Sequence, residues 1–124
     1  PMAEVVQKRH EDERYNQVRF LMGSIAATGT PRLAVLGLVY RAGALDCTES
    51  FGIHVAREAQ RRGLTLWVYD PAAAWLPSAA LNGLPIVQSA VEAIREATDV
   101  VIAADWDEFR SLDLTGICVH DLRK

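Results

Sequence analysis

The sequence predicts an α/β fold, a three-layer α/β/α sandwich built on a small parallel sheet and preceded by one further helix. Two observations predict this class: four short apolar runs recur along the chain, and segments with helical periodicity lie between them. Strands that alternate with helices in this way form parallel sheets joined by right-handed crossovers. The length of 124 residues fits a single such domain.

The first expected element is a helix that lies before the sheet, within residues 3–27. Its apolar residues recur at intervals of three and four, which is the period of one helix face. These residues are Val18, Leu21, Met22 and Ile25. A Gly-Thr-Pro sequence at residues 29–31 breaks the pattern. We therefore divide the chain into an N-terminal helix and linker, residues 1–30, and an α/β domain, residues 31–124.

The strands are expected at residues 33–39, 64–69, 99–104 and 116–120. The first is a continuous apolar run, which is typical of a strand buried on both faces, and we expect the last to be buried as well.

Helices are expected at residues 50–62 and 89–97, with a short one at 106–111. Gly63 directly follows the first of these and is placed as its C-terminal cap. Ser89 and Glu92 form a capping box, in which each side chain bonds the backbone amide of the other residue.

The residues that follow the strands are the candidates for a ligand site, because parallel α/β sheets bind ligands beyond the carboxyl ends of their strands. In this Rossmann-like arrangement four segments meet that condition: Tyr40-Arg41, Asp70-Pro71, Asp105-Trp106 and residues 121–123. The guanidinium groups of Arg41 and Arg123 suit phosphate, since each offers a planar fork of donors. The start of the helix near Ser50 also favours an anion, and Tyr40 and Trp106 offer flat faces to a base or sugar. Chance placement of two of the thirteen basic residues explains the spacing equally well.

Several classes of function are excluded by composition and motifs. A net charge of −3 is not typical of a nucleic-acid-binding protein. The apolar runs are far shorter than the roughly 20 residues that span a bilayer. The turn after the first strand contains neither a phosphate-binding P-loop nor the GxGxxG dinucleotide fingerprint. We therefore expect a soluble, cytoplasmic domain that binds neither nucleic acid nor membrane.

The histidines and cysteines form no recognisable zinc or catalytic motif. These residues are His10, His54, His120, Cys47 and Cys118. Cys118 falls inside a predicted strand and is expected to be a small buried apolar side chain rather than a nucleophile. We predict no catalytic residue, no metal ligand and no disulfide in this chain.

Four motifs, in order along residues 31–124, resemble the C-terminal, UDP-binding domain of the UDP-glucose/GDP-mannose dehydrogenase family. The first two are Gly-Leu-Val-Tyr-Arg-Ala-Gly-Ala-Leu-Asp-Cys-Thr-Glu-Ser at residues 37–50 and Val-Tyr-Asp-Pro at 68–71. The others are Asp-Trp-Asp-Glu-Phe at residues 105–109 and Asp-Leu-Arg-Lys at 121–124. Asn16-Gln17 resembles the end of the helix that precedes this domain in the family.

This resemblance implies a role in the oxidation of a nucleotide sugar. Enzymes of the family convert the primary alcohol of a UDP-sugar or GDP-sugar to a carboxylate in two NAD-dependent hydride transfers. It implies that Tyr40 packs near the nucleotide sugar, that Arg41 stands at a substrate-binding lysine, and that Arg123 contacts the diphosphate. NAD is held mainly by an N-terminal domain, and a central domain carries the catalytic cysteine and the homodimer contact. Neither Cys47 nor Cys118 matches that cysteine, so we expect this chain to bind substrate without converting it.

Thr48 is the main departure from the family pattern, because it replaces an arginine that reaches toward the NAD pyrophosphate. The resemblance therefore assigns no cofactor-binding residue here. It also leaves a second hypothesis open, a non-catalytic regulatory module that binds another anion or a protein partner. The chain ends at Arg123-Lys124 inside a motif, and we expect it to be a piece of a longer enzyme.

Overall fold

The computed structural model describes residues 16–25, 29–38, 51–76 and 78–122. Its centre is one parallel sheet with the strand order β2-β1-β3-β4. The strands are β1 (Arg32–Leu36), β2 (Thr65–Tyr69), β3 (Asp99–Ile102) and β4 (Cys118–Asp121). The predicted parallel sheet is confirmed, and each strand falls within two residues of its expected start.

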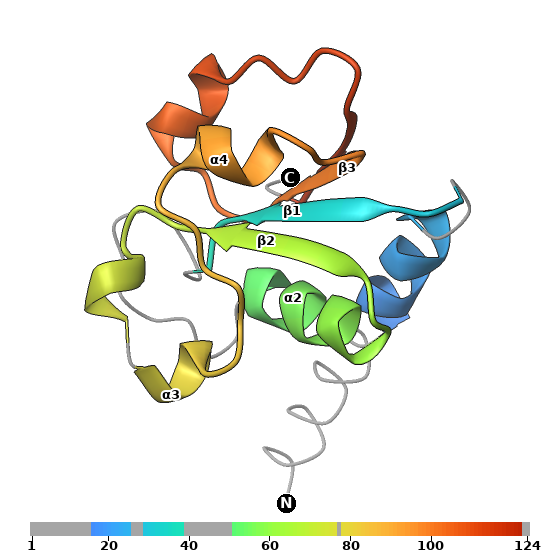
Figure 1. Cartoon of the computed structure of the whole chain (residues 1–124), viewed down its shortest axis with the longest axis horizontal. Helices are drawn as coiled ribbons and strands as arrows, with labels where there is room; N and C mark the ends of the chain where they lie inside the picture. The colour runs from blue at the N-terminus through green and yellow to red at the C-terminus, as the bar shows by residue number, and fades with distance from the viewer. Residues whose placement is uncertain (1–15, 26–28, 39–50, 77, 123–124) are drawn as a thin grey trace, which may run out of the picture.

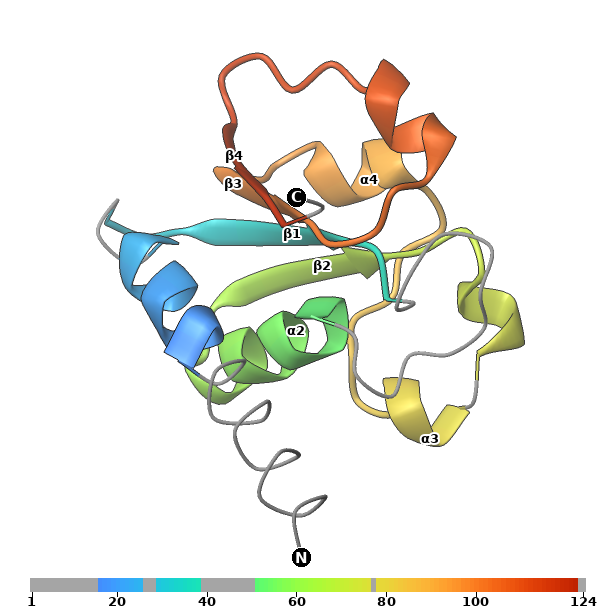
Figure 2. The same cartoon turned by 180° about the vertical axis from the view of Figure 1, so that it is seen from behind.

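Helices cover both faces of the sheet, which confirms the predicted three layers (Figure 1). One face carries α2 (Phe51–Arg61) and a helix over residues 16–25. The other face carries α4 (Ala90–Ile94) and the 3-10 helix η2 (Asp107–Ser111), as Figure 2 shows from behind. The short helices η1 (Ala73–Trp75) and α3 (Ser78–Leu81) lie between β2 and α4 in the sequence. None of the helices within the described ranges has the length and apolar character that a membrane crossing requires.

The alternation of side chains along β1 divides the core into two halves. Leu33 and Val35 pack with the helices of one face, whereas Ala34 and Leu36 pack with α4 and η2 on the other. All four are fully buried. Successive residues of a strand point to opposite faces, so a run of consecutive apolar residues is needed to fill both halves.

The helix over residues 16–25 has the apolar face that its sequence predicts. Val18, Leu21, Met22 and Ile25 are buried and belong to the same core half as α2. Phe20 points away from this face and is 80% exposed. The helix thus packs directly on the domain that follows it.

The C-terminal end of α2 has the predicted glycine cap. The Leu64 amide donates to the Ala59 carbonyl at 3.0 Å, and the Gly63 amide donates to the Gln60 carbonyl at 3.1 Å. These two bonds form a Schellman motif. Gly63 has a φ of +76°, a conformation that favours glycine.

The capping box at the start of α4 is formed only in part as predicted. The Ser89 hydroxyl accepts a hydrogen bond from the Glu92 amide at 3.1 Å. The Glu92 carboxylate, however, accepts from the Gln88 amide at 3.2 Å rather than from Ser89. Ser89 has an extended backbone, and the amide that the Glu92 carboxylate reaches is that of the preceding residue, Gln88. The helix ends at Ile94, three residues before its predicted end.

The expectation that the fourth strand is buried is wrong. Among the described residues, β4 pairs only with β3, and it lies at an edge of the four-stranded sheet. Cys118 and Val119 are exposed, so Cys118 is not the buried apolar residue that the sequence predicted. An edge strand has a neighbour on one side only, which leaves its outer residues in contact with solvent.

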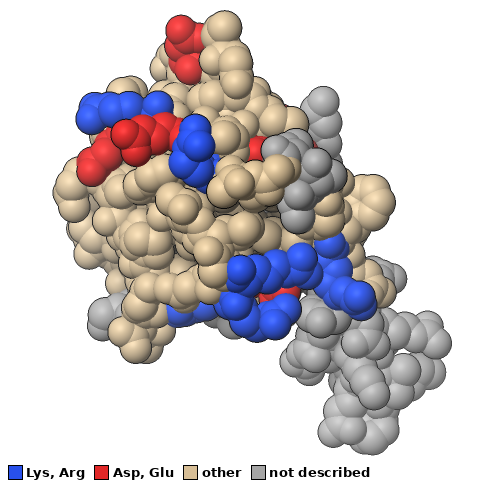
Figure 3. Space-filling view, turned by 45° about the vertical axis from the view of Figure 1, so that its right-hand side comes forward, with Lys and Arg blue, Asp and Glu red and all other residues tan. Residues whose placement is uncertain are grey.

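Basic side chains gather over α2, with an acidic group between them (Figure 3). The Glu58 carboxylate accepts hydrogen bonds from Arg61 at 3.0 Å and from Arg62 at 2.8 Å. The bonds from Arg61 and then Arg62 lower the pKa of Glu58 from 4.5 to about 2. The folded state therefore favours the ionised carboxylate more than the unfolded chain does.

Replacement of Glu58 by Gln is expected to remove an acid-dependent part of the stability. In the unmodified chain this contribution is fully present above pH 4.5 and is lost as the pH falls toward about 2. Urea unfolding at several pH values should show a difference of about 0.5–1 kcal/mol between the two proteins at pH 7. The difference should shrink between pH 4.5 and 2. A difference that does not change over this range would contradict the assignment.

Candidate functional site

Asp70 joins the carboxyl ends of three strands. It follows β2 directly and is 1% exposed. Its carboxylate accepts hydrogen bonds from the Leu38 amide after β1 at 2.7 Å and from the Trp106 indole after β3 at 3.2 Å. A third bond, from the Ala72 amide at 2.7 Å, closes the turn that begins at Asp70 itself. The edge at which the sequence places its ligand site is thus held together by one buried carboxylate.

β1 and β3 approach each other closely at the same edge. Their crossovers leave in opposite directions, since β1 leads to β2 on one side and β3 leads to β4 on the other. Such a switch point is where open α/β sheets bind ligands. Gly37 has a φ of +109°, and a Cβ built on it would lie 2.6 Å from the Ala104 amide nitrogen. Only a residue without a side chain fits between the two strand ends.

The two described amides that follow β1 are not available to a pyrophosphate. Dinucleotide-binding turns present free backbone amides to the phosphates. Here the Gly37 amide donates to the Tyr69 carbonyl at 2.9 Å, and the Leu38 amide donates to Asp70. These two amides are therefore already engaged within the fold.

A cavity of about 640 Å³ lies beside the carboxyl end of β4. One wall is the helix over residues 16–25, including Asn16 and Gln17, and another is formed by Phe51 at the start of α2. His120, Asp121 and Leu122 complete the lining. The cavity is thus bounded by segments from the start, the middle and the end of the chain.

The site residues predicted from the sequence are Tyr40, Arg41 and Arg123, and all three lie outside the described residues. Thr48, which departs from the family pattern, and Ser50 also lie outside them. Their described neighbours are positioned at the carboxyl edge. Leu38, two residues before Tyr40, bonds Asp70 there, and Leu122, directly before Arg123, lines the cavity. The structure confirms that the Asp70 and Trp106 segments meet at one edge.

Tyr69, the last residue of β2, presents a neutral hydroxyl near this edge. The hydroxyl donates to the Glu108 carboxylate at 3.1 Å, and the ring packs edge-on against Phe109, with centroids 6.3 Å apart. Burial and the bond to Glu108 raise the pKa of Tyr69 to about 12. The side chain therefore remains a hydrogen-bond donor at neutral pH and connects β2 to η2.

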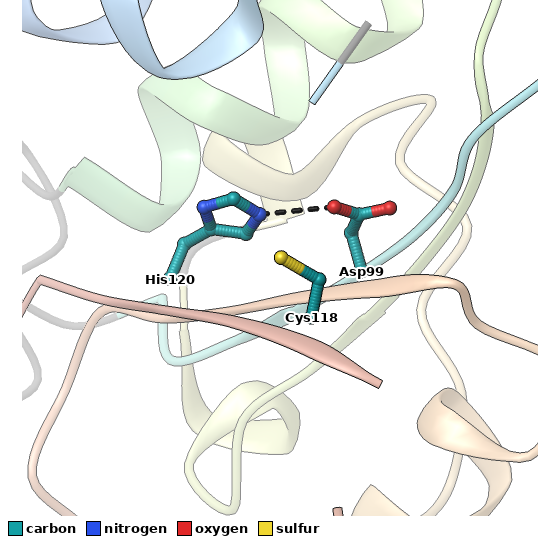
Figure 4. A group of neighbouring side chains, drawn as sticks. All are labelled: Asp99, Cys118 and His120. Carbon is teal, nitrogen blue, oxygen red and sulfur yellow. Dashed lines mark hydrogen bonds and ion pairs between the residues drawn. The ribbon is translucent and has the colours of Figure 1, made fainter. Parts of the chain in front are cut away.

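Sequence reasoning missed one group of side chains, Asp99, Cys118 and His120 (Figure 4). One ligand atom from each lies within 4.8 Å of the others. Part of this group could have been recognised from the sequence, because Cys118 and His120 are two residues apart in a predicted strand and therefore share a face. The strand register that places Asp99 opposite Cys118 was not visible in the sequence.

Residues 34–121 match the UDP-binding domain of the UDP-glucose/GDP-mannose dehydrogenase family. The chain belongs to this family. The match extends from β1 to the end of β4 and so covers the whole sheet except the first two residues of β1. The fold and the family that the four motifs indicated are both confirmed.

Relatives in the UDP-glucose/GDP-mannose dehydrogenase family are similar over the same region. The UDP-glucose 6-dehydrogenase of Rhizobium meliloti is 34% identical over 82 residues, which are 66% of this chain and 19% of that protein. The UDP-glucose 6-dehydrogenase of Rickettsia felis is 33% identical over 96 residues, 74% of this chain and 20% of that protein. This chain therefore spans about a fifth of the length of these relatives.

Solved structures of the family have the same fold. A UDP-glucose dehydrogenase from the archaeon Pyrobaculum islandicum superposes with a TM-score of 0.78 at 29% identity, over 96% of this chain and 28% of that one. A GDP-mannose dehydrogenase from Pseudomonas aeruginosa superposes with a TM-score of 0.73 over 87% of this chain and 28% of that one. At 20% identity, the second comparison supports the fold alone.

Proposed function

We propose that this UDP-binding domain holds the nucleotide part of the substrate in an NAD-dependent dehydrogenase. The whole enzyme would oxidise the hexose of a UDP-hexose or GDP-hexose to the uronic acid. The family match and the relatives named UDP-glucose 6-dehydrogenase support this reaction and favour UDP-glucose as the substrate. The isolated chain would bind the nucleotide sugar without converting it.

The cavity beside β4 is the observation that carries the proposal. It is lined in part by residues 120–122 at the carboxyl end of β4, and α/β folds bind their ligands at the carboxyl ends of their strands. Leu122 lines it and is followed directly by Arg123, the residue for which the resemblance implies a diphosphate contact. We assign the diphosphate to Arg123 and the nucleotide sugar to Tyr40 and Arg41.

We assign NAD to a part of the enzyme outside this chain. The amides of Gly37 and Leu38 are engaged within the fold, so neither of these two is available to a pyrophosphate. Thr48 also lacks the charge that the family's arginine would provide at that position. The other parts of the enzyme would carry the catalytic cysteine and the homodimer contact, and we expect the enzyme to act in the cytoplasm.

Replacement of Arg123 by Ala should weaken UDP binding by about 10- to 150-fold. This range corresponds to the loss of one charge-assisted hydrogen bond, about 1.5–3 kcal/mol. Calorimetric titration of the 124-residue chain with UDP, UDP-glucose and GDP-mannose measures the effect. Lys124→Ala is the matched control, because it removes the same charge from the adjacent position and should leave the affinity nearly unchanged.

Two results would contradict the proposal in different ways. An Arg123→Ala chain that binds UDP as tightly as the original would remove Arg123 from the site. A chain whose melting temperature does not respond to any of the three nucleotides would contradict nucleotide binding itself, because binding at a hundredfold excess over Kd stabilises by about 2.7 kcal/mol. That second result would favour a regulatory module with another ligand.

A further inference from the structure

The group formed by Asp99, Cys118 and His120 lies on one face of two neighbouring strands. Asp99 begins β3 and Cys118 begins β4, and the parallel register places them opposite each other. His120 lies two residues after Cys118, so its side chain is on the same face of β4. Figure 4 shows the sulfur of Cys118 directed toward the space between the imidazole and the carboxylate.

We propose that these three side chains bind a zinc ion. A thiolate, an imidazole and a carboxylate are the donors that zinc takes in proteins, whereas calcium and magnesium prefer oxygen ligands alone. Zinc bonds of about 2.0–2.3 Å in a tetrahedron place the donor atoms roughly 3.3–3.7 Å apart. The ligand atoms here lie within 4.8 Å of one another, and His120 Nε2 is 3.0 Å from Asp99 Oδ2.

The Asp99 carboxylate is held in place by a second layer of hydrogen bonds. Asp99 is 1% exposed, and its second oxygen accepts from the Thr98 hydroxyl at 2.8 Å. The Thr98 oxygen in turn accepts from the Arg32 amide of β1 at 2.8 Å. Such outer partners orient metal ligands and tune the affinity of a site.

Cys118 is the member of the group that other structural roles do not explain. Asp99 and His120 already bond each other, and the Thr98 hydroxyl bonds the other Asp99 oxygen, so both of these residues have a role in the fold without a metal. The thiol does not fill a core position, since Cys118 is exposed. As a ligand it would give the ion three protein donors and leave the fourth position to water. Among the residues that the structure describes, no further His, Cys, Asp or Glu joins this group.

The ion would fasten the edge strand β4 to β3. In the part of the chain that the structure describes, β3 is the only strand that pairs with β4, so the position of β4 in the sheet depends on contacts across that one boundary. His120 also lines the cavity at the carboxyl end of β4. The zinc site requires only its own three ligands, so it does not depend on the nucleotide-binding proposal.

Titration of the reduced, chelator-treated 124-residue chain with zinc and with cobalt tests the proposal. We expect one equivalent of zinc to bind with a dissociation constant below about 1 µM and to raise the melting temperature. Cobalt should give the absorption band of a thiolate-bound ion. Cys118→Ser and His120→Gln should each lower the zinc affinity by at least about a hundredfold, because even second-layer changes cost about 10- to 100-fold.

Both variants are expected to fold like the original chain. Cys118 is exposed, and a Gln at position 120 retains a donor for the Asp99 carboxylate. Cys47→Ser and His54→Ala are the matched controls and should bind zinc like the original chain. The chain has two cysteines, so the Cys47→Ser protein carries only the Cys118 thiol. In that background zinc should protect the thiol from alkylation, and His120→Gln should abolish the protection.

Three results would overturn the zinc site: no stoichiometric binding, unchanged affinity in both ligand variants, or loss of binding in the Cys47→Ser control. None of these bears on UDP affinity, which is measured separately. A failure of the metal site and a failure of nucleotide binding are therefore distinguishable.

Discussion

Replacement of Gly37 by Ala is expected to destabilise the chain by about 2–6 kcal/mol, from the strain of a positive φ and from overpacking. The backbone at Gly37 has a φ of +109°, which L-residues rarely adopt. The added methyl group would also lie 2.6 Å from the Ala104 amide nitrogen and 2.7 Å from its Cβ. Both neighbours belong to the chain just after β3, so relief requires that the two strand ends move apart.

Gly63→Ala is the matched control for this effect. Gly63 also has a positive φ, +76°, but a Cβ there would have no atom within 4 Å. Its replacement should cost only the conformational term, about 1–2 kcal/mol. Denaturant unfolding monitored by circular dichroism compares the two variants. Equal losses would show that the contact between β1 and β3 is looser than the structure indicates.

Replacement of Asp70 by Ala should cost about 3–5 kcal/mol, because buried donors that lose their acceptor each cost about 1–3 kcal/mol and partly recover by contact with water. The donors that lose an acceptor are the amides of Leu38 and Ala72 and the indole of Trp106. They belong to the ends of β1, β2 and β3. The loss should therefore loosen the whole carboxyl edge and weaken UDP binding as well as the fold.

Asp105→Ala is the control for Asp70, since Asp105 lies at the same edge but is exposed. Its ion pair with Arg110, at 2.9 Å, is on the surface. The change should cost at most about 1 kcal/mol. Unfolding curves at pH 7, together with UDP titration of each folded variant, test both parts. A mild effect of Asp70→Ala would mean that the strand ends are held by other contacts.

The strand positions were predictable because burial on both faces requires continuous apolar sequence. β1 and β3 are runs of this kind, and they became the two central strands. The ends were less predictable: β1 stops at Leu36 although the apolar run continues to Val39, because Gly37 turns the backbone. The exposure of β4 was not predictable, because nothing in its four residues reveals whether another strand pairs on its outer side.

The location of the candidate site was predictable from the sequence, but the hydrogen bonds between its residues were not. The rule that ligands bind at the carboxyl ends of parallel strands selects the Asp70 and Trp106 segments, and these two residues are in contact. The hydrogen bond from the Leu38 amide to Asp70 forms because β1 and β2 are neighbours in the sheet, and the sequence does not reveal that order. The roles of Tyr40, Arg41 and Arg123 stay predictions, since these residues lie outside the described ranges.

Length, composition and motifs by themselves determined that this chain is an α/β domain of the UDP-glucose/GDP-mannose dehydrogenase family. Such conclusions depend on local periodicity and on short motifs, both of which a linear sequence contains. Only the tertiary structure decided that β4 is an edge, that Asp70 joins three strand ends, and that Asp99 meets Cys118 and His120. These contacts join residues from 19 to 36 positions apart, and strand order and register, which bring them together, are properties of the packed core.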